Sequence, residues 1–535
     1  MVEKISFTPE ELVFYVYFSI LFGMKMIGIS DGNAVYSLLL LAGLAFYGLK
    51  ELITRKTVLE WILTVLLLGT AMLIYLHSGE KAMLLDFSLL LAVKNVPEKR
   101  VFSLAGILFT CGLGTITFLR VFGILPDNYK ILPDYFGGYT LLHSLGFPHN
   151  NVVLTTFAIG SMTILYLCGN KSKLRTAGVT LLLWVTAGGY FQYVTGRTGF
   201  IACVLFGLLN FYFQFYYKGR AFEKICIRLV YPFCVVVSVI LPLILKLTTY
   251  QSSIEDRLRL AYYYYQNNTP KLFGQVLSNP QGEVFGVDIA LFNLLMQSGI
   301  IAFAIVSILN IGLVEYAIKK QRKDILAIAV CMFILGITEP LLYNTSFKNI
   351  LFIFMGYMVS DLAGRAVQRG NRCAWIGREW KPLPVRDRIF DVKIRQSGRK
   401  AAEQLYRKRG RVLLTSVLAG CLIGLCTYFY VQSPQTIYIR EDIPNSLPEE
   451  ICDQTNLQDI SDQPVFLGYM EGAMVVNFTR GTDLGFYPLQ GEVAHEEALK
   501  KSITAGCYGL VLILGLQALW QLGSATIRQR DQQKM

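Results

Sequence analysis

The stretch VLEWILTVLLLGTAMLIYL, residues 58–76, decides the fold class. Its only charged side chain is Glu60, which lies near its start. About 20 apolar residues in helical conformation cross the hydrocarbon core of a bilayer. Because backbone N–H and C=O groups find no water there, such a stretch must satisfy them internally, as a helix does. Residues 58–76 are therefore predicted to form a membrane-spanning helix.

Similar stretches recur along all 535 residues, of which 53% are hydrophobic and only 16% are charged. A typical soluble domain carries about 25% charged residues. The short alternating segments of a β-barrel are missing from the sequence. The expected spans are residues 11–28, 32–49, 58–76, 82–95, 101–124, 150–168, 177–195, 198–216, 226–246, 289–316, 324–339, 347–364, 412–431 and 503–523. The sequence predicts an all-α polytopic membrane protein of about fourteen transmembrane helices, with a twelve-helix core and a C-terminal two-helix hairpin.

Lysine and arginine are concentrated in alternate loops, and this pattern predicts the orientation of the chain. The most basic connections follow residues 49, 95, 168, 216, 316 and 364. Positive loops face the cytoplasm, so both termini are expected inside, in a bacterial cytoplasmic membrane. The net charge of +13 then belongs to membrane edges, where it meets anionic lipid. No nucleic-acid partner is needed to explain it.

The N-terminus and the cysteines point to a retained membrane domain. Thr8-Pro9-Glu10-Glu11 has the features of a helix start, with a capping threonine, an early proline and acids near the positive end of the dipole. No small-residue cleavage site follows, so the first span is expected to stay in the protein. Most of the eleven cysteines lie within apolar runs. They indicate packing residues, with neither a disulfide framework nor a metal motif.

Three regions are expected along the chain. Residues 1–364 form the transmembrane domain, with external loops at 125–149 and 247–288. Residues 365–411 are a basic cytoplasmic linker, in which 387–409 is expected to be an amphipathic helix on anionic lipid or a docking segment for a cytosolic partner.

Residues 412–535 comprise two helices that bracket an acidic external insertion, residues 432–502. Within it, PVFLGYM (464–470) and GAMVVNF (472–478) favour strands. The insertion is therefore predicted to be a small α+β unit, too small for a large core of its own.

Several cations lie on the face predicted to be external, where positive charge is disfavoured. They are Arg120, Arg197, Lys246, Arg257, Arg259, Lys271 and Lys348. Arg197 stands in VTGRTGF, where Gly196 and Gly199 permit a tight turn and a close backbone approach. Guanidinium groups grip two oxygens at once and suit a diphosphate. The alternative is that these side chains reach lipid headgroups or pair with Asp256, Asp288 or Glu339.

The stretch HSLGFPHNN, residues 143–151, holds two of the four histidines on the same face. His149 is expected to accept a proton or to donate to a phosphate or sugar oxygen. Alternatively, it caps the following helix beside Asn150. In the later loop, four tyrosines follow Arg259, beginning at Tyr262. They fit either an interfacial aromatic belt or a platform on which a sugar stacks.

These segments together resemble a known family. LGFPHNN (145–151), TGRTG (195–199), RL…LFG…GVDIALFNLLMQSGI (257–300) and TEPLLYNTSFKNILF (338–352) are similar, in order and spacing, to motifs of Wzy-type O-antigen and capsule polymerases. The resemblance covers residues 11–364. Two motifs differ in detail, because proline precedes His149 and because Asp288 is followed by Ile289.

The resemblance implies a glycosyltransferase that joins undecaprenyl-diphosphate-linked oligosaccharides outside the membrane. Arg197 and Arg257 would then clamp the diphosphate, with Arg259 or Arg120 assisting, and charge on the leaving group would be stabilised there. His149 would be the base or would position the acceptor. The further substrate-binding candidates are Asn150, Asp288, Glu339 and Tyr262. Because no external Asp-x-Asp pair occurs, no metal or other cofactor is expected. A chain-length regulator is an expected protein partner.

Three other functions remain open. An O-antigen-type ligase differs from a polymerase only in its acceptor. A flippase for lipid-linked oligosaccharide would show repeated halves and charges near the bilayer midplane, whereas the charges here collect at one face. The third alternative is a non-catalytic scaffold of an envelope complex.

Overall fold

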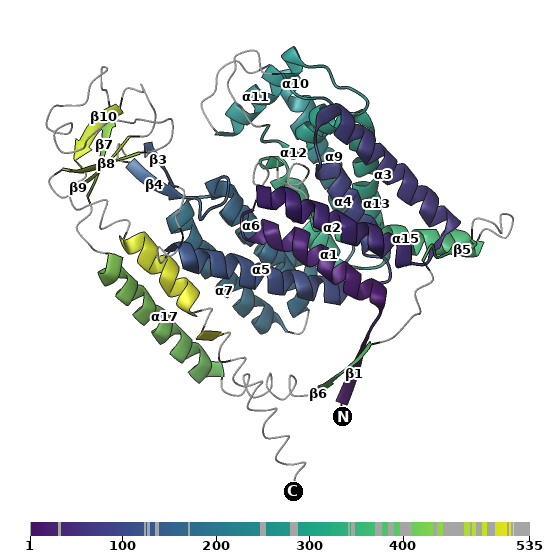
Figure 1. Ribbon diagram of the computed structural model, residues 1–535, viewed down its shortest axis with the longest axis horizontal. Coiled ribbons are helices and arrows are strands. Elements are labelled where there is room, and N and C mark those ends of the chain that lie inside the picture. The colour runs from purple at the N-terminus through teal and green to yellow at the C-terminus, as the bar shows by residue number, and fades with distance from the viewer. Residues whose placement is uncertain are drawn as a thin grey trace, which may run out of the picture.

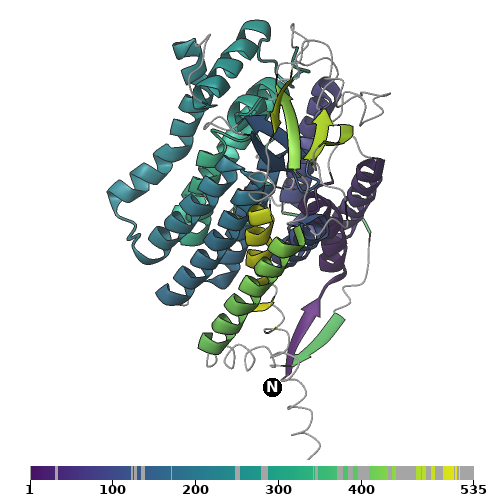
Figure 2. The same cartoon turned by 90° about the vertical axis from the view of Figure 1, so that its left-hand side faces the viewer.

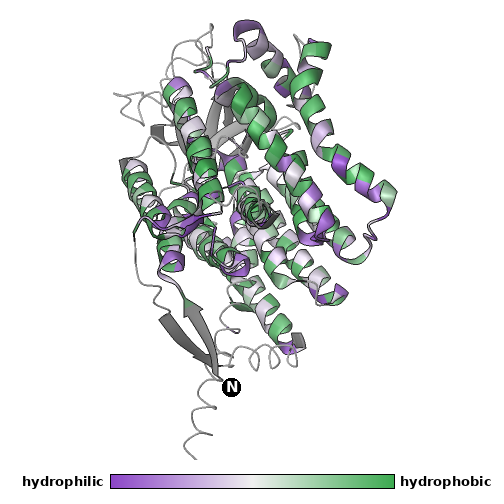
Figure 3. Ribbon diagram, turned by 90° about the vertical axis from the view of Figure 1, so that its right-hand side faces the viewer, coloured by the Kyte–Doolittle hydropathy of each residue, from purple (hydrophilic) through white to green (hydrophobic). Residues whose placement is uncertain are grey.

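A computed structural model describes most of the chain. The described residues are 2–29, 34–121, 125, 129–133, 139–169, 172–246, 253–278, 287–340, 343, 348–369, 377–383, 390–395, 409–431, 436–441, 465–470, 473–477, 484–488, 498–510, 513–514 and 517. Eight helices in these ranges are long and apolar enough to cross a bilayer. The chain is therefore a multi-pass, α-helical membrane protein. Hydrophobic residues cover the lengths of these helices, and hydrophilic residues are more frequent near helix ends (Figure 3).

The helices form one bundle (Figure 1, Figure 2). Their bounds are α1 Pro9–Met26, α2 Ala34–Ile53, α3 Val58–Ser78, α4 Ala82–Ala92, α5 Glu98–Val121, α6 Asn150–Cys168, α7 Lys173–Val194, α8 Arg197–Phe215, α9 Ala221–Val235, α10 Leu241–Leu245, α11 Ser253–Asn267, α12 Ala290–Asn293, α13 Gly299–Lys319, α14 Lys323–Leu335, α15 Leu351–Arg369 and α17 Arg409–Val431. A last described helix covers residues 498–510. Each expected span therefore contains helix, and for residues 150–168 the bounds agree at both ends with α6.

Two of the expected spans are short helices in the middle of the bundle. α4 has 11 residues and α14 has 13. Almost every side chain of both helices is buried, because α4 packs on α3 and α15 while α14 packs on α8 and α9. Apolar residues at these positions face other helices as well as lipid. This is why uniform hydrophobicity predicted longer spans than the structure contains.

One face of the bundle collects the basic connections and ties them to carboxylates; we call it the basic face. Arg322, in the turn between α13 and α14, lies 2.6 Å from Glu98 at the start of α5. Arg100 contacts Glu11 at the start of α1 at 2.7 Å. Lys94 pairs with Glu60 of α3. For the basic connections before α5 and α14, these contacts confirm the predicted gathering at one face, together with the starts of α1 and α3.

Two short strand pairs lie at this end of the molecule. β1 (Val2–Phe7) pairs antiparallel with β6 (Phe390–Arg395), with Val2 opposite Arg395 and Ile5 opposite Val392. β2 (Lys56–Thr57) pairs with β5 (Glu379–Trp380). The prediction of an amphipathic helix over 387–409 is therefore wrong for 390–395, because alternating apolar residues there meet a complementary strand at the N-terminus. Residues 396–408 lie outside the described chain.

The insertion between α17 and residue 498 contains a four-stranded sheet at the other end of the bundle (Figure 1, Figure 2). Its strand order is β10 (Leu484–Pro488), β7 (Thr436–Glu441), β9 (Ala473–Asn477), β8 (Val465–Met470). β7 runs parallel to β9, and the other neighbours are antiparallel. The strands predicted at 464–470 and 472–478 are confirmed as β8 and β9. The acidic segment 442–464 lies outside the described residues.

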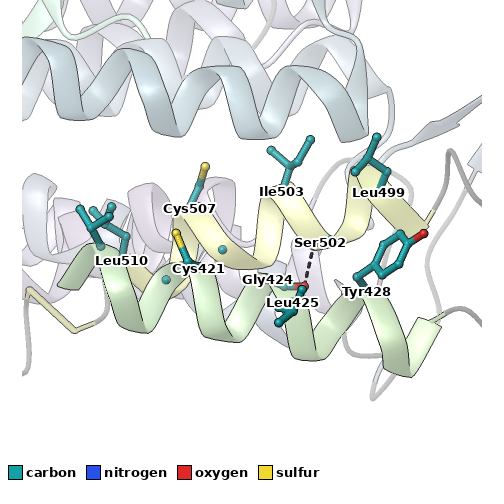
Figure 4. Close-up of a pocket in the computed structure, with 12 residues that line it drawn as sticks. Cys421, Gly424, Leu425, Tyr428, Leu499, Ser502, Ile503, Cys507 and Leu510 are labelled. Atoms are coloured by element: carbon teal, nitrogen blue, oxygen red, sulfur yellow. Dashed lines mark hydrogen bonds between the residues drawn. The ribbon is translucent and has the colours of Figure 1, made fainter. Parts of the chain in front are cut away.

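The two C-terminal helices pack closely on each other and on α7. A Cβ atom at Gly420 would lie 2.7 Å from the carbonyl oxygen of Gly506, so only glycine allows this approach. The Ser502 hydroxyl donates to the Gly424 carbonyl at 2.6 Å (Figure 4). Apolar side chains and two cysteines line a cavity of about 520 Å³ between the helices. Thr504 Oγ1 then donates to the Gly189 carbonyl of α7 at 2.8 Å, which joins the hairpin to the bundle.

Candidate active site

The first turns of α6 and α8 lie in contact at the end of the bundle opposite the basic face; we call this end the His149 face. A Cβ at Gly199 would lie 2.3 Å from the carbonyl carbon of Leu154, and one at Gly196 would lie 3.4 Å from Asn151 Cα. The predicted close backbone approach at both glycines is confirmed. It brings Arg197 and His149, which begin neighbouring helices, to the same face.

Arg257 of α11 brings together two of the predicted carboxylates. Its Nε lies 3.6 Å from Asp288 Oδ2, and its Nη2 lies 4.0 Å from Glu339 Oε1. Asp288 precedes α12, and Glu339 follows α14. Three residues proposed from separate motifs therefore meet in space. The alternative that an outer arginine pairs with Asp288 or Glu339 is also seen, and at these distances the pairs are loose.

Backbone contacts hold the two carboxylate segments in register. Ala290 N donates to the Gly336 carbonyl at 2.9 Å, so the residues just after Asp288 are fixed to the turn that carries Glu339. Farther along, Gly299 and Gly274 pack backbone to backbone, both with positive φ, and a Cβ at Gly299 would lie 2.2 Å from Gly274 N. The chain at Gly274 thus rests on the start of α13.

α11 packs on the protein through one face, and this face contains two of the four tyrosines. Leu258 and Tyr264 are buried against Val287 and Phe292, and the Tyr265 hydroxyl donates to the Val239 carbonyl at 3.0 Å. For Tyr264 the expected aromatic belt or sugar platform is wrong, because its side chain is buried in this cluster. Tyr265 is half-buried, and for it the two interpretations stay predictions. Tyr262, like Arg259, is half-buried on α11.

Glu339 is the most deeply buried carboxylate of the His149 face that carries a predicted role, with 5% of its surface exposed. The Thr198 hydroxyl donates to it, which adds the first turn of α8 to the cluster. Among the described residues its Oε1 has no hydrogen-bond partner. Glu339 lies in the connection after α14, outside the membrane-crossing helices, and burial raises its pKa to about 7 against the opposing effects of Thr198 and Arg257.

The N-terminus of α8 is suited to an anion. Its N-cap residue, Gly196, makes no side-chain cap, so the first N–H groups keep their partial positive charge. Arg197, the first residue of the helix, is exposed. Helix N-termini with an adjacent guanidinium are common phosphate sites. Through Thr198, this N-terminus is continuous with Glu339 and Arg257.

His149 caps α6, as its structural interpretation predicted. Its Nδ1 accepts a hydrogen bond from Asn151 N at 3.3 Å, and its ring is exposed. Asn150 is buried, and its Nδ2 donates to the Val194 carbonyl at 3.1 Å. The Asn150 amide thus holds α6 against the end of α7. The contact of Asn150 with substrate stays a prediction.

The loop before α6 rests on Arg120 and on an aromatic stack. A Cβ at Gly146, where φ is +74°, would lie 2.2 Å from the guanidinium carbon of Arg120. His143, at the end of the hairpin formed by β3 (Tyr129–Pro133) and β4 (Tyr139–His143), stacks on Tyr193 with ring centroids 4.0 Å apart. Arg120 therefore supports the 143–149 loop. Arg257, Asp288, Glu339 and Thr198, which we call the Arg257 cluster, make their contacts with one another.

Lys348 is a correction to the sequence-based placement. It was expected to be an outer-face cation, but only 2% of its surface is exposed. Its Nζ donates to Thr156 Oγ1 of α6 at 2.7 Å and lies 5.7 Å from the centre of the Phe147 ring. A lysine after a polar segment resembles a surface residue in sequence, and only the packing of residues 348–350 under α6 reveals its burial.

Sequence reasoning missed Thr156, Thr198 and Lys25. Lys25 is buried near the end of α1 with its Nζ 4.6 Å from the centre of the Tyr36 ring. A signal was present for each residue. Thr156 is a hydroxyl in an apolar run, Thr198 follows Arg197 directly, and Lys25 is a lone charge in the last turn of a hydrophobic helix.

No known protein family, curated protein or solved structure matches this chain. The evidence for function is the geometry of the His149 face.

Proposed function

We propose that the protein is a glycosyltransferase that polymerises undecaprenyl-diphosphate-linked oligosaccharides for capsule, exopolysaccharide or O-antigen synthesis. The observation that carries the proposal is the meeting of Arg257, Asp288, Glu339 and Thr198 at the N-terminus of α8. These residues come from four segments distant in sequence. Cations and carboxylates gathered at one end of a membrane bundle suit chemistry on a lipid-anchored diphosphate at the membrane surface.

In the proposed topology fourteen spans cross a bacterial cytoplasmic membrane, and the span expected at 324–339 ends with α14 at Leu335, before Glu339. The basic face is cytoplasmic, as the positive-inside rule requires, and both termini lie on that side. The His149 face is then external, and it is the side on which lipid-linked units would be joined. A chain-length regulator remains a proposed partner.

The leaving group in this reaction is undecaprenyl diphosphate, so negative charge develops on phosphate as the glycosidic bond breaks. Arg257 and Arg197 are the proposed clamp, assisted by the first N–H groups of α8. The present partners of Arg257 are 3.6 and 4.0 Å away. Because such loose pairs leave guanidinium N–H groups available, a diphosphate would compete for them with shorter, charge-assisted hydrogen bonds.

The test is purified protein in vesicles, supplied with lipid-linked repeat units, with the length of the glycan measured. Arg257→Ala and Arg197→Ala are each expected to lower the polymer yield by about 10²–10³-fold, the usual effect of losing one charge-stabilising donor. Arg228→Ala is the matched control. Arg228 lies on α9 and pairs with Glu315 of α13, away from the cluster. Its replacement is expected to leave the polymer yield unchanged.

Each alternative outcome contradicts the proposal in a distinct way. Movement of lipid-linked units across the vesicle without new glycosidic bonds would identify a flippase. Transfer to a different lipid acceptor, without chain growth, would identify a ligase. Unchanged polymer from both arginine variants would remove these residues from the reaction.

A further inference from the structure

We propose that Glu339, acting through Oε1, is the group that takes the proton from the attacking sugar hydroxyl. The inference rests on the proposed function and names a role that the resemblance to polymerases leaves to His149. Three observations support it: the placement of Glu339, the tautomer of His149, and the partners of Asp288.

Glu339 has one engaged and one available oxygen. Thr198 donates to the carboxylate, whereas Oε1 has no hydrogen-bond partner among the described residues and lies 4.0 Å from Arg257 Nη2. A buried carboxylate oxygen without a donor is unfavourable unless a ligand supplies one. A sugar hydroxyl bound beside Arg257 would supply that donor. The same guanidinium would hold the diphosphate that leaves.

The charge environment suits proton transfer near neutral pH. Burial raises the pKa of Glu339 to about 7, and a general base works best when its pKa lies near the working pH. An ordinary exposed carboxylate is a much weaker base. Glu339 is buried in the protein itself, with Thr198 of α8 and Arg257 of α11 beside it.

His149 is held in the tautomer that cannot perform this step. Its Nδ1 accepts the N–H of Asn151, so the proton of the neutral ring is on Nε2. The exposed Nε2 is then a donor, suited to orient a sugar or phosphate oxygen. To accept a proton at Nδ1, the ring would have to release the cap of α6.

Asp288 is the remaining carboxylate of the cluster. Its side chain is 45% exposed and lies 3.6 Å from Arg257 Nε. Solvent and the guanidinium both stabilise its ionised form, so it is suited to orient Arg257 and not to accept a proton.

In the proposed step one bond to the anomeric carbon forms as another breaks. The acceptor oxygen attacks the anomeric carbon of the donor sugar with its lone pair, and its O–H proton moves to Glu339 Oε1. The bond between the anomeric carbon and the phosphate oxygen breaks, and its electron pair leaves with undecaprenyl diphosphate. Glu339 then returns its proton to water when the product departs.

The experiment compares wild type, Glu339→Gln, Glu339→Asp and His149→Gln in the vesicle assay between pH 5.5 and 8.5. Wild type is expected to lose activity as the pH falls below about 7, because Glu339 becomes protonated. Glu339→Gln keeps the side-chain volume and an acceptor for Thr198 but cannot take up a proton. It is expected to lose about 10²–10⁴-fold in rate while binding undecaprenyl diphosphate within a few-fold of wild type. Glu339→Asp keeps a carboxylate and is expected to retain part of the rate and an acidic limb.

His149→Gln is expected to keep the same acidic limb, because the titrating group is elsewhere. Glu315→Gln is the matched control for a Glu-to-Gln change, since Glu315 pairs with Arg228 away from the cluster; it should retain the wild-type rate and pH profile.

The results that would overturn the inference differ from those that overturn the proposed function. A wild-type rate that stays flat from pH 8.5 to 5.5 would refute Glu339 as the proton acceptor, even if the Gln variant failed to fold. So would a Gln variant that polymerises at more than a tenth of the wild-type rate, or loss of the acidic limb in His149→Gln alone. If wild type forms no glycosidic bond at any pH, the proposed function and this inference fall together.

Discussion

Replacing Gly199 with alanine is expected to separate α6 from α8 and to disturb both ends of the candidate site. The added Cβ would lie 2.3 Å from the Leu154 carbonyl carbon and 2.5 Å from Thr155 N. Carbon atoms reach optimal contact at about 3.5–4.0 Å, so the two backbones must part by roughly 1.2–1.7 Å. Backbone atoms cannot rotate aside as a side chain does, and the whole helix start has to move.

The expected destabilisation is about 1–3 kcal/mol, the usual range for overpacking. Against this, Gly→Ala inside a helix favours the helix by up to about 1 kcal/mol. The control therefore needs the same propensity gain without the clash. Gly188, within α7, has nothing within 4 Å of an added Cβ among the described atoms, so Gly188→Ala isolates the propensity term. The two variants should differ by about 1–3 kcal/mol.

The assay is thermal unfolding of the two variants in the same detergent, alongside polymer yield. A difference of 1 kcal/mol shifts the Tm by about 2–4 °C in a chain of 150–250 residues and by less in a longer one. We expect Gly199→Ala to melt below Gly188→Ala and to lose polymer yield, because Arg197 and Thr198 move with the start of α8. Equal melting temperatures for the two variants would refute the close approach of α6 and α8.

Two further predictions concern contacts outside the Arg257 cluster. Thr156→Val removes the acceptor of the buried Lys348 side chain and should destabilise the protein by about 1–3 kcal/mol. In a Lys348→Met background the same change should cost much less stability. Additive effects of the two changes in thermal unfolding would contradict the contact. In the β1–β6 pair Lys4 lies opposite Lys393, so Lys4→Cys with Lys393→Cys should form an oxidisable cross-link seen by peptide mass spectrometry. Ser6→Cys with Lys393→Cys, shifted by two residues, should not, and the reverse result would refute the register.

Hydrophobicity was enough to predict where helices lie, because the signal is local, although α4 and α14 are shorter than the spans expected there. α6 starts and ends at the predicted residues, and the basic loops gather at one face through pairs such as Arg322 with Glu98. The glycines beside Arg197 also predicted a real contact, since a missing Cβ has a geometric use that sequence alone suggests. The sequence also named Asp288 and Glu339 as alternative partners for the outer cations, and Arg257 lies near both.

Sequence reasoning could not predict the burial of individual side chains, because burial depends on which distant segment packs over each residue. Lys348 has the sequence context of a surface lysine, but α6 covers it. Tyr264 has the sequence context of an interfacial belt, but it is buried against the 287–296 segment. Arg120 carries the same charge as Arg257 and supports a different loop. In each case the partner is distant in sequence, and no local pattern indicates it.

The β1–β6 pair has a consequence for synthesis. Residues 2–7 emerge from the ribosome before most of the helices, and their partner at 390–395 emerges only after those helices have been made. At about 5–20 residues per second, that delay is roughly 20–80 seconds. During this interval the N-terminal strand exposes an unsatisfied edge, which can be captured by any available strand. The β1–β6 pairing joins the two ends of the main helical domain. It therefore forms late, after the helices between the two strands have been made.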